Sequence, residues 1–181
     1  MRIVAGSRKG HGIAAPKGVV TRPTGDRVRE AVFSIVGPVE GARVLDLFAG
    51  SGAMGLEALS RGATAAVFVE RDREACRVIQ RNLEKLRLTG ADVRCGDVLA
   101  ELRAERGRGR RYDLVLADAP YEEWERYEKS LGELLPDVLG DDALAVVETA
   151  SRVEPQLPLA LVTTRRYGSA RITVFSHNDS N

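Results

Sequence analysis

The sequence has few of the residues that build metal centres and disulfide-bonded folds. Its 181 residues include two cysteines, Cys76 and Cys95, and two histidines, His11 and His177. The cysteines form no CxxC pair, and the histidines stand at opposite ends of the chain. This pattern argues against a disulfide framework and a zinc site, so we expect no bound metal.

Long hydrophobic runs are also missing. The sequence contains no stretch of about 18 apolar residues of the kind that spans a membrane. The first residues, MRIVAGSRKGHG, lack the continuous apolar segment of a secretory signal. We therefore expect a cytoplasmic protein with no membrane partner. The length favours one full domain and is short for two.

Acidic residues are absent from the first 25 positions. This segment holds five basic side chains, namely Arg2, Arg8, Lys9, Lys17 and Arg22. The whole chain has 27 Lys and Arg against 26 Asp and Glu, so everything after this segment is mildly acidic. A basic segment on an acidic body suggests a polyanionic partner such as nucleic acid, and a merely solvated basic terminus is the alternative.

Apolar β-branched runs alternate with helical patterns from Arg43 onward. The runs are RVLDLFA, AAVFVE, DVRCGD, YDLVLAD and ALAVVE. Strands that are apolar nearly throughout and are separated by amphipathic helices indicate a parallel sheet covered on both faces. The segments LALVTT and RITVF are joined by RRYGSA, which leaves no room for a crossover helix and predicts an antiparallel hairpin.

Shorter segments flank or interrupt this alternation. The pieces RIVAG, GIAA and GVV predict a small basic β-hairpin or meander at the start of the chain. In DRVREAVFSIV the apolar spacing predicts a helix, on which Arg27 and Arg29 can be exposed charges. The charged run ELRAERGRGRR is interpreted as a loop that is either simply solvated or faces RNA, and SHNDSN as a flexible tail.

A glycine turn follows the first apolar run. The stretch LDLFAGSGAMG places Gly50, Gly52 and Gly55 after a strand, where an open parallel sheet binds ligands at its carboxyl edge. Glu70 ends the next strand, where an acid can hold ribose hydroxyls. NAD and S-adenosylmethionine are both adenosine compounds, so these residues predict a nucleoside site without choosing between them. A purely structural turn is the alternative.

Two further acidic residues indicate which kind of ligand the site could bind. Asp46 lies inside the first strand, where it would attract the amino group of a methionine moiety and repel a pyrophosphate. It can instead bond the backbone amides of the turn. Asp97 closes the third strand and can accept from an adenine amino group or cap a helix.

The fourth strand ends in Asp118-Ala119-Pro120-Tyr121, where the topology places the reacting end of the ligand. This tetrapeptide is similar to the (Asp/Asn)-Pro-Pro-(Tyr/Phe) motif of methyltransferases that modify exocyclic or amide nitrogens. With RPTGDRVREAVFSI, LDLFAGSGAMGLEALSRGA, VERD and RRYGSARITVF, residues 2–175 resemble the RsmD family, which methylates guanine N2 in 16S rRNA. One departure is Ala119, which stands where the family has a proline.

The resemblance implies a Rossmann-like, class I S-adenosyl-L-methionine-dependent methyltransferase. Its α/β fold would have a mostly parallel seven-stranded sheet that ends in an antiparallel hairpin. We expect a basic RNA-binding β-hairpin extension over residues 1–22, the methyltransferase domain over 23–176 and a flexible tail over 177–181. The expected partner is 16S rRNA, within the small ribosomal subunit or an assembly intermediate, and the expected state is a monomer.

The resemblance also implies the site residues. The Asp118 carboxylate and the Ala119 carbonyl would accept the N–H groups of the guanine amine, Pro120 would stiffen the turn, and Tyr121 would stack on the base. The residues expected to hold the cofactor are Asp46, Phe48, Ala49, Gly50, Ser51, Gly52, Glu70, Arg71, Asp97 and Val98. The residues expected to contact RNA are Arg2, Arg8, Lys9, Lys17, Arg22, Thr24, Asp26 and Arg27.

Three alternatives stay open at this point. DNA adenine-N6 and protein glutamine methyltransferases share a related tetrapeptide. An NAD-dependent oxidoreductase would explain the GxGxxG spacing and Glu70, although no evident hydride-transfer acid accompanies them. A non-catalytic RNA-binding assembly protein would explain the loss of the proline at Ala119.

Overall fold

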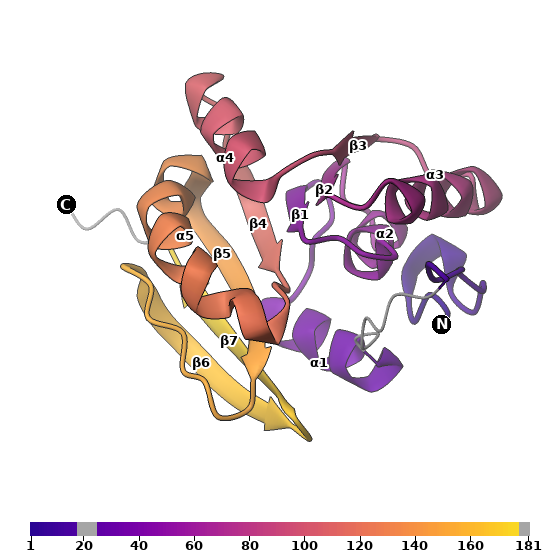
Figure 1. Ribbon diagram of the computed structural model, residues 1–181. Coiled ribbons are helices and arrows are strands. Elements are labelled where there is room, and N and C mark those ends of the chain that lie inside the picture. The colour runs from indigo at the N-terminus through magenta and orange to yellow at the C-terminus, as the bar shows by residue number, and fades with distance from the viewer. Residues whose placement is uncertain (18–24, 178–181) are drawn as a thin grey trace.

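A seven-stranded sheet runs through the computed structural model, which describes residues 1–17 and 25–177 (Figure 1). The strands are β1 (Arg43–Leu47), β2 (Ala65–Glu70), β3 (Ala91–Cys95), β4 (Tyr112–Ala117), β5 (Leu139–Ala150), β6 (Ala160–Tyr167) and β7 (Ala170–Ser176). Their order in the sheet is β3-β2-β1-β4-β5-β7-β6. Strands β1 to β5 pair in parallel, and β7 pairs antiparallel with both β5 and β6. The predicted parallel sheet with a terminal antiparallel hairpin is confirmed.

Helices cover both faces of the sheet, so the inner strands β1, β2 and β4 are buried on both sides. The helices are α1 (Asp26–Val36), α2 (Ala53–Ser60), α3 (Arg73–Leu86), α4 (Val98–Gly107) and α5 (Trp124–Val138), with 3₁₀ turns η1 (Gly6–Arg8) and η2 (Tyr121–Glu123). Side chains of α1, α2 and α3 form one core cluster with alternate strand residues, including Val44 and Leu116. Those of α4 and α5 form the second with the intervening residues, including Leu45 and Ala117. Figure 1 shows these two helical layers on opposite sides of the sheet.

The helix after the first strand lies very close to the sheet. At Gly55 in α2, an added Cβ would lie 2.3 Å from Cε1 of the Phe68 ring in β2. A larger residue would therefore push α2 away from the sheet. Close helix–strand packing is the role expected of the last glycine in a GxGxxG turn.

The charged run before β4 is not the loop that the sequence suggested, because α4 continues to Gly107. Its residue Glu105 is fully buried and accepts hydrogen bonds from the Tyr112 hydroxyl, from Arg94 and, at 2.7 Å, from Arg108. Burial raises the pKa of Glu105, but these bonds outweigh it and lower the pKa to about 2. Arg94 and Tyr112 belong to β3 and β4, so the local charge pattern could not reveal these contacts.

The two ends of the described chain are held to the domain. Within residues 1–17 the first two predicted pieces lie antiparallel, with a bridge between Arg2 and Gly12 and hydrogen bonds from Ile3 N–H to the His11 carbonyl and from Ile13 N–H to the Met1 carbonyl, but they form no extended strands. The third predicted piece, GVV at residues 18–20, lies outside the described residues. The backbone N–H of His177, placed in the tail by the sequence, donates to the Ala143 carbonyl at 2.9 Å. Among the helices in the described ranges, none combines the length and hydropathy that a membrane crossing requires.

Candidate active site

The glycine turn lies at the carboxyl end of β1 and has an unusual backbone. Phe48, Gly50 and Gly52 have φ angles of 58°, 55° and 78°. At Gly52 an added Cβ would also lie 3.0 Å from Cγ1 of Ile79, so both conformation and space favour glycine. Phe48 adopts positive φ despite its side chain, and its ring packs edge-on against Tyr127 of α5 with centroids 4.8 Å apart.

Glu70 fixes this turn. One of its carboxylate oxygens accepts from the Gly50 backbone N–H at 2.8 Å, and the other accepts from the Asp72 N–H at 2.9 Å. A carboxylate oxygen has two lone pairs, so these bonds leave capacity for ligand hydroxyls. Asp97 caps α4 by accepting from the Ala100 N–H at 2.9 Å, and its side chain is otherwise exposed. Asp97 therefore has the capping role that the sequence left open.

Asp46 is buried beneath the turn, with 4% of its surface exposed. Its carboxylate accepts from the Gly55 backbone N–H in α2 at 2.9 Å. Burial raises the pKa of Asp46 to about 8, against the lowering effect of that hydrogen bond and with a smaller raising effect from Glu70. The sequence analysis gave Asp46 an alternative role in which it bonds the backbone amides of the glycine turn. Asp46 does bond a backbone amide, but this amide belongs to α2, the helix that follows the turn.

Arg71 lies at the end of β2 and pairs with Glu123 in η2. Two hydrogen bonds join their side chains, at 2.8 and 3.3 Å. The bond from Arg71 lowers the pKa of Glu123. This pair connects the element after β4 to the element after β2 across the carboxyl edge of the sheet. Val98, the first residue of α4, is buried.

The Asp118-Ala119-Pro120-Tyr121 turn follows β4 at the same edge. Ala119 is 1% exposed and belongs to the core cluster that contains α5. The Pro120 carbonyl accepts from the Glu123 N–H at 2.9 Å, and the Tyr121 hydroxyl donates to Glu148 of β5 at 2.9 Å. Burial and these bonds fix the turn, although Ala119 replaces the first proline of the motif.

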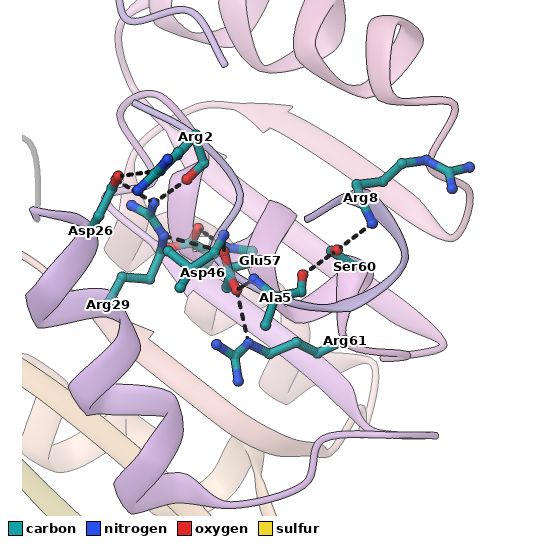
Figure 2. A network of polar contacts seen from close by, with 11 residues as sticks. Arg2, Ala5, Arg8, Asp26, Arg29, Asp46, Glu57, Ser60 and Arg61 are labelled. Atoms are coloured by element: carbon teal, nitrogen blue, oxygen red, sulfur yellow. Dashed lines mark hydrogen bonds and ion pairs between the residues drawn. The ribbon is translucent and has the colours of Figure 1, made fainter. Parts of the chain in front are cut away.

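A buried acid of α2 is one of the groups that hold the N-terminal segment, residues 1–17, to this helix (Figure 2). Glu57 accepts from the backbone N–H groups of Val4 and Ala5 at 2.8 and 2.9 Å. It also pairs with Arg61 at 2.9 Å and with Arg29 at 3.4 Å. The side chains of Arg29 and Glu57 are both completely buried. The interpretation of Arg29 as an exposed helix charge is therefore wrong.

A second polar side chain joins the N-terminal segment to the glycine turn. Asn82 of α3 is 1% exposed. Its Oδ1 accepts from the Ala14 N–H at 2.9 Å, and its Nδ2 donates to the Ala14 carbonyl at 3.0 Å and to the Ser51 carbonyl at 3.3 Å. The same side chain therefore contacts the segment expected to bind RNA and the turn expected to bind the cofactor.

The residues expected to contact RNA have different surroundings. Arg2 has an exposed side chain and pairs with Asp26 at 3.3 Å. Arg8 instead donates to the carbonyls of Leu86 and Arg87, which end α3. Its guanidinium therefore caps a helix.

Three of the other expected RNA contacts are exposed, namely Lys9, Lys17 and Arg27. Asp26 is also an expected RNA contact. Burial raises the pKa of its carboxyl group, but hydrogen bonds from Arg29 and Arg2 outweigh this effect, so the pKa of Asp26 is lowered. Arg22 and Thr24 lie outside the described residues.

Comparison with known proteins identifies the family. Residues 1–176 match the family model described as "Conserved hypothetical protein 95", which represents RsmD proteins. The ribosomal RNA small subunit methyltransferase D of Escherichia coli K12 is 38% identical over 161 residues, covering 87% of this chain and 78% of that protein. The chain belongs to the RsmD family. The RsmD resemblance of the sequence is thereby confirmed.

Similarity extends over nearly the full length of other proteins. YlbH of Bacillus subtilis, named as a candidate rRNA methyltransferase, is 39% identical over 97% of this chain and 98% of its own. The solved structure of a hypothetical protein from Thermus thermophilus is 32% identical, covers 97% of this chain and 98% of its own, and superposes with a TM-score of 0.83.

RsmD membership settles several of the sequence predictions. It confirms the Rossmann-like methyltransferase fold, the enzyme class and the S-adenosyl-L-methionine cofactor. It also confirms the prediction of an rRNA methyltransferase and rejects two alternatives, the NAD-dependent oxidoreductase and the non-catalytic RNA-binding protein. The roles of the individual site residues stay predictions.

The structure adds polar residues that the sequence analysis did not select in this RsmD protein: Glu57, Asn82 and Glu148. All are at most 9% exposed. Each occupies an otherwise apolar helix or strand face, and a polar residue on such a face was the available signal. Glu57 pairs with Arg61 within its own helix, but the contacts with Val4, Ala14 and Tyr121 span 27 or more positions in sequence, so spacing alone could not assign them.

Proposed function

We propose that this protein transfers a methyl group from S-adenosyl-L-methionine to the exocyclic N2 of a guanine in 16S rRNA. The observation that carries the proposal is the turn of Asp118 to Tyr121, which adjoins the end of β4. It lies at the same sheet edge as the glycine turn after β1. Asp46 and Asp118 line one small cavity between these two strands and α2.

The donor groups at this edge fit S-adenosyl-L-methionine. Asp46 is a buried carboxyl group whose ionised form a cationic amino group would stabilise, Glu70 keeps lone pairs for ribose hydroxyls, and Asp97 presents an exposed carboxylate for an adenine amine. Gly50 and Gly52 leave the backbone open to close approach. When bound, the cofactor supplies an electrophilic methyl group on a sulfonium, which transfers without a metal.

The turn after β4 supplies hydrogen-bond acceptors that orient the guanine amine, which is a poor nucleophile by itself. The lone pair of this amine is delocalised into the ring, so the nitrogen must be oriented before it can attack a methyl group. The Asp118 carboxylate and the Ala119 carbonyl accept the two N–H groups and stabilise the positive charge that develops on nitrogen. The Tyr121 ring stacks on a base drawn out of the RNA.

The N-terminal segment supports an RNA substrate. The side chains of Lys9, Lys17 and Arg27 are exposed, and Arg2 is 70% exposed beside Asp26. Such side chains contact phosphates and supply affinity with little sequence information. Names of relatives specify the small-subunit rRNA. We propose that the substrate is the small subunit or an assembly intermediate, and that the enzyme acts as a monomer in the cytoplasm.

The experiment that tests this proposal measures transfer of radiolabelled methyl groups to small ribosomal subunits that lack the RsmD modification. Digestion of the rRNA to nucleosides then shows which base carries the label. The proposal requires label in N2-methylguanosine. Label in another nucleoside would overturn the target atom, and no label on subunits or on free 16S rRNA would overturn the function. Parallel reactions with DNA and with a protein acceptor test the alternative N-methyltransferase activities.

A further inference from the structure

Glu148 lies beside the catalytic turn but has no role in the chemistry described so far. It belongs to β5, and its neighbour Val147 is the register partner of Ala117, the last residue of β4. Asp118 and Glu148 therefore occupy equivalent positions on adjacent parallel strands. Glu148 is 9% exposed, so its carboxylate is held close to the core.

Three acids share one face of the sheet at this edge. Side chains alternate along a strand, so Asp46, Asp118 and Glu148 point to the same face as Val44, Leu116 and Val146. The three acids line one cavity of about 20 Å³, whose other walls are apolar side chains of α1, α2 and the neighbouring strands. That volume is too small for a nucleobase, so a base does not enter the space between these acids.

A direct contact connects Glu148 to the catalytic turn. The Tyr121 hydroxyl donates to Oε1 of Glu148 at 2.9 Å. Tyr121 begins η2, outside the sheet, and is partly exposed, whereas Glu148 is held within a central strand. A rigid acceptor at the tip of a partly exposed ring restricts both rotation of the ring and movement of its backbone.

We propose that Glu148 is a positioning residue, which holds the Tyr121 ring in the orientation that clamps the substrate base. The inference rests on the proposed function, because it assigns Tyr121 to stacking on that base. Glu148 acts through the hydrogen bond, so an acceptor oxygen suffices and the negative charge is dispensable. The competing explanation is that Tyr121 merely satisfies a buried carboxylate, in which case the ring needs no help from Glu148.

Four variants separate these explanations. Glu148→Gln keeps an acceptor oxygen, Glu148→Ala removes it, Tyr121→Phe removes the donor, and the double variant Tyr121→Phe/Glu148→Ala removes both. Glu133→Gln on α5 is the matched control, because Glu133 is exposed. Each protein is assayed for kcat and KM with small subunits that lack the modification, and for S-adenosyl-L-methionine affinity by calorimetry.

We expect Glu148→Ala and Tyr121→Phe each to lower kcat on the order of tenfold, since small misplacements of reacting groups cost this much or more. The double variant should be no worse than the poorer single variant, and Glu148→Gln and Glu133→Gln should stay within about threefold of the parent. Cofactor affinity should not change. Full activity of Glu148→Ala, or a multiplicative loss in the double variant, would overturn the proposal.

A spectroscopic measurement tests the contact without any methyl transfer. With tyrosine labelled at the ring carbon that bears the hydroxyl, Glu148→Ala should shift the Tyr121 resonance. Tyr112 donates to Glu105 instead and serves as an internal control. If Glu148→Ala does not fold, Tyr121→Phe still tests the kinetic effect. An inactive parent protein would refute the proposed function, whereas an active parent with a fully active Glu148→Ala variant would refute only this inference.

Discussion

At the residue scale, the acids at the carboxyl edge of the sheet have different environments. Glu70 and Asp97 are partly or largely exposed and accept hydrogen bonds from backbone N–H groups at strand and helix ends. Asp46 is enclosed by the core and accepts from the Gly55 backbone N–H. Burying a carboxylate favours its neutral form, so Asp46 is the acid whose ionisation opposes folding.

This cost predicts a pH-dependent effect of the isosteric change Asp46→Asn. The pKa of about 8 in the folded protein lies above the ordinary aspartate pKa of 3.8, so the protonated carboxyl favours the folded state. That contribution is complete below about pH 4 and is lost as pH rises through about 8. The amide oxygen of Asn can still accept from Gly55. The variant should therefore gain stability relative to the parent as the pH increases from 4 to 8.

Urea denaturation at a series of pH values, without cofactor, measures this difference. Asp141→Asn is the control, because Asp141 is exposed and the difference should then be flat. A flat difference for Asp46→Asn as well would mean that Asp46 ionises in the folded protein as easily as it does in water.

The role proposed for Asp118 predicts how its substitution changes the rate of methyl transfer. Replacing it with Ala removes an acceptor for the target amine and should lower kcat by about 10²- to 10³-fold, which is typical for loss of one preorganised charge-stabilising group. Asp118→Asn keeps one acceptor oxygen and should lose less. Radiolabel transfer measures both rates, and calorimetry should show unchanged cofactor affinity. Undiminished transfer by Asp118→Ala would exclude this role.

At the element scale, polar contacts hold residues 1–17 to the helices of the domain. Glu57 connects it to α2, and Asn82 connects it to α3 and to the glycine turn. Figure 2 shows how the Glu57 carboxylate lies between the N-terminal backbone and the guanidinium groups of Arg29 and Arg61. The segment expected to bind RNA is therefore connected to the element that begins at the cofactor turn.

Removing this acid should destabilise the protein strongly. Glu57→Ala leaves the buried Arg29 guanidinium without its carboxylate partner on α2, and breaking a buried ion pair on one side costs about 3–5 kcal/mol. Glu84→Ala on the exposed side of α3 should change stability by less than about 0.5 kcal/mol. Equilibrium denaturation measures both. Equal effects of the two changes would show that the buried pair contributes little.

Elements differ in how well the sequence predicted them. The inner strands, within RVLDLFA, AAVFVE and YDLVLAD, were recovered because burial on both faces makes them apolar nearly throughout, and this signal is local. The turn after β4 was recovered because its tetrapeptide is specific. Helix α4 was partly missed and Arg29 was misplaced, since their buried charges are explained only by Arg94, Tyr112 and Glu57 on other elements. Such long-range pairing has no periodicity that a sequence reading can detect.

At the scale of the whole molecule, the basic residues of the N-terminal segment separate into two groups. The Arg8 guanidinium donates to carbonyls at the end of α3, and Lys85 of that helix donates to the Gly12 carbonyl at 2.8 Å. Lys9 and Lys17 are exposed. The described part of the segment therefore combines side chains that dock it onto the domain with side chains that face solvent, and the exposed ones, with Arg2 among them, are available to an RNA backbone.

This division predicts opposite effects of substitutions in one short segment. Each phosphate contact contributes about 0.7 to 0.9 to the slope of log affinity against log salt concentration. Lys9→Ala and Lys17→Ala should each weaken binding to 16S rRNA, lower that slope by about this amount and leave thermal stability unchanged. Arg8→Ala should lower the melting temperature, because the α3 carbonyls lose their cap, and should leave the slope unchanged. Filter binding across a salt series and thermal denaturation measure the two effects; a lower slope for Arg8→Ala without a loss of stability would place its guanidinium on RNA instead.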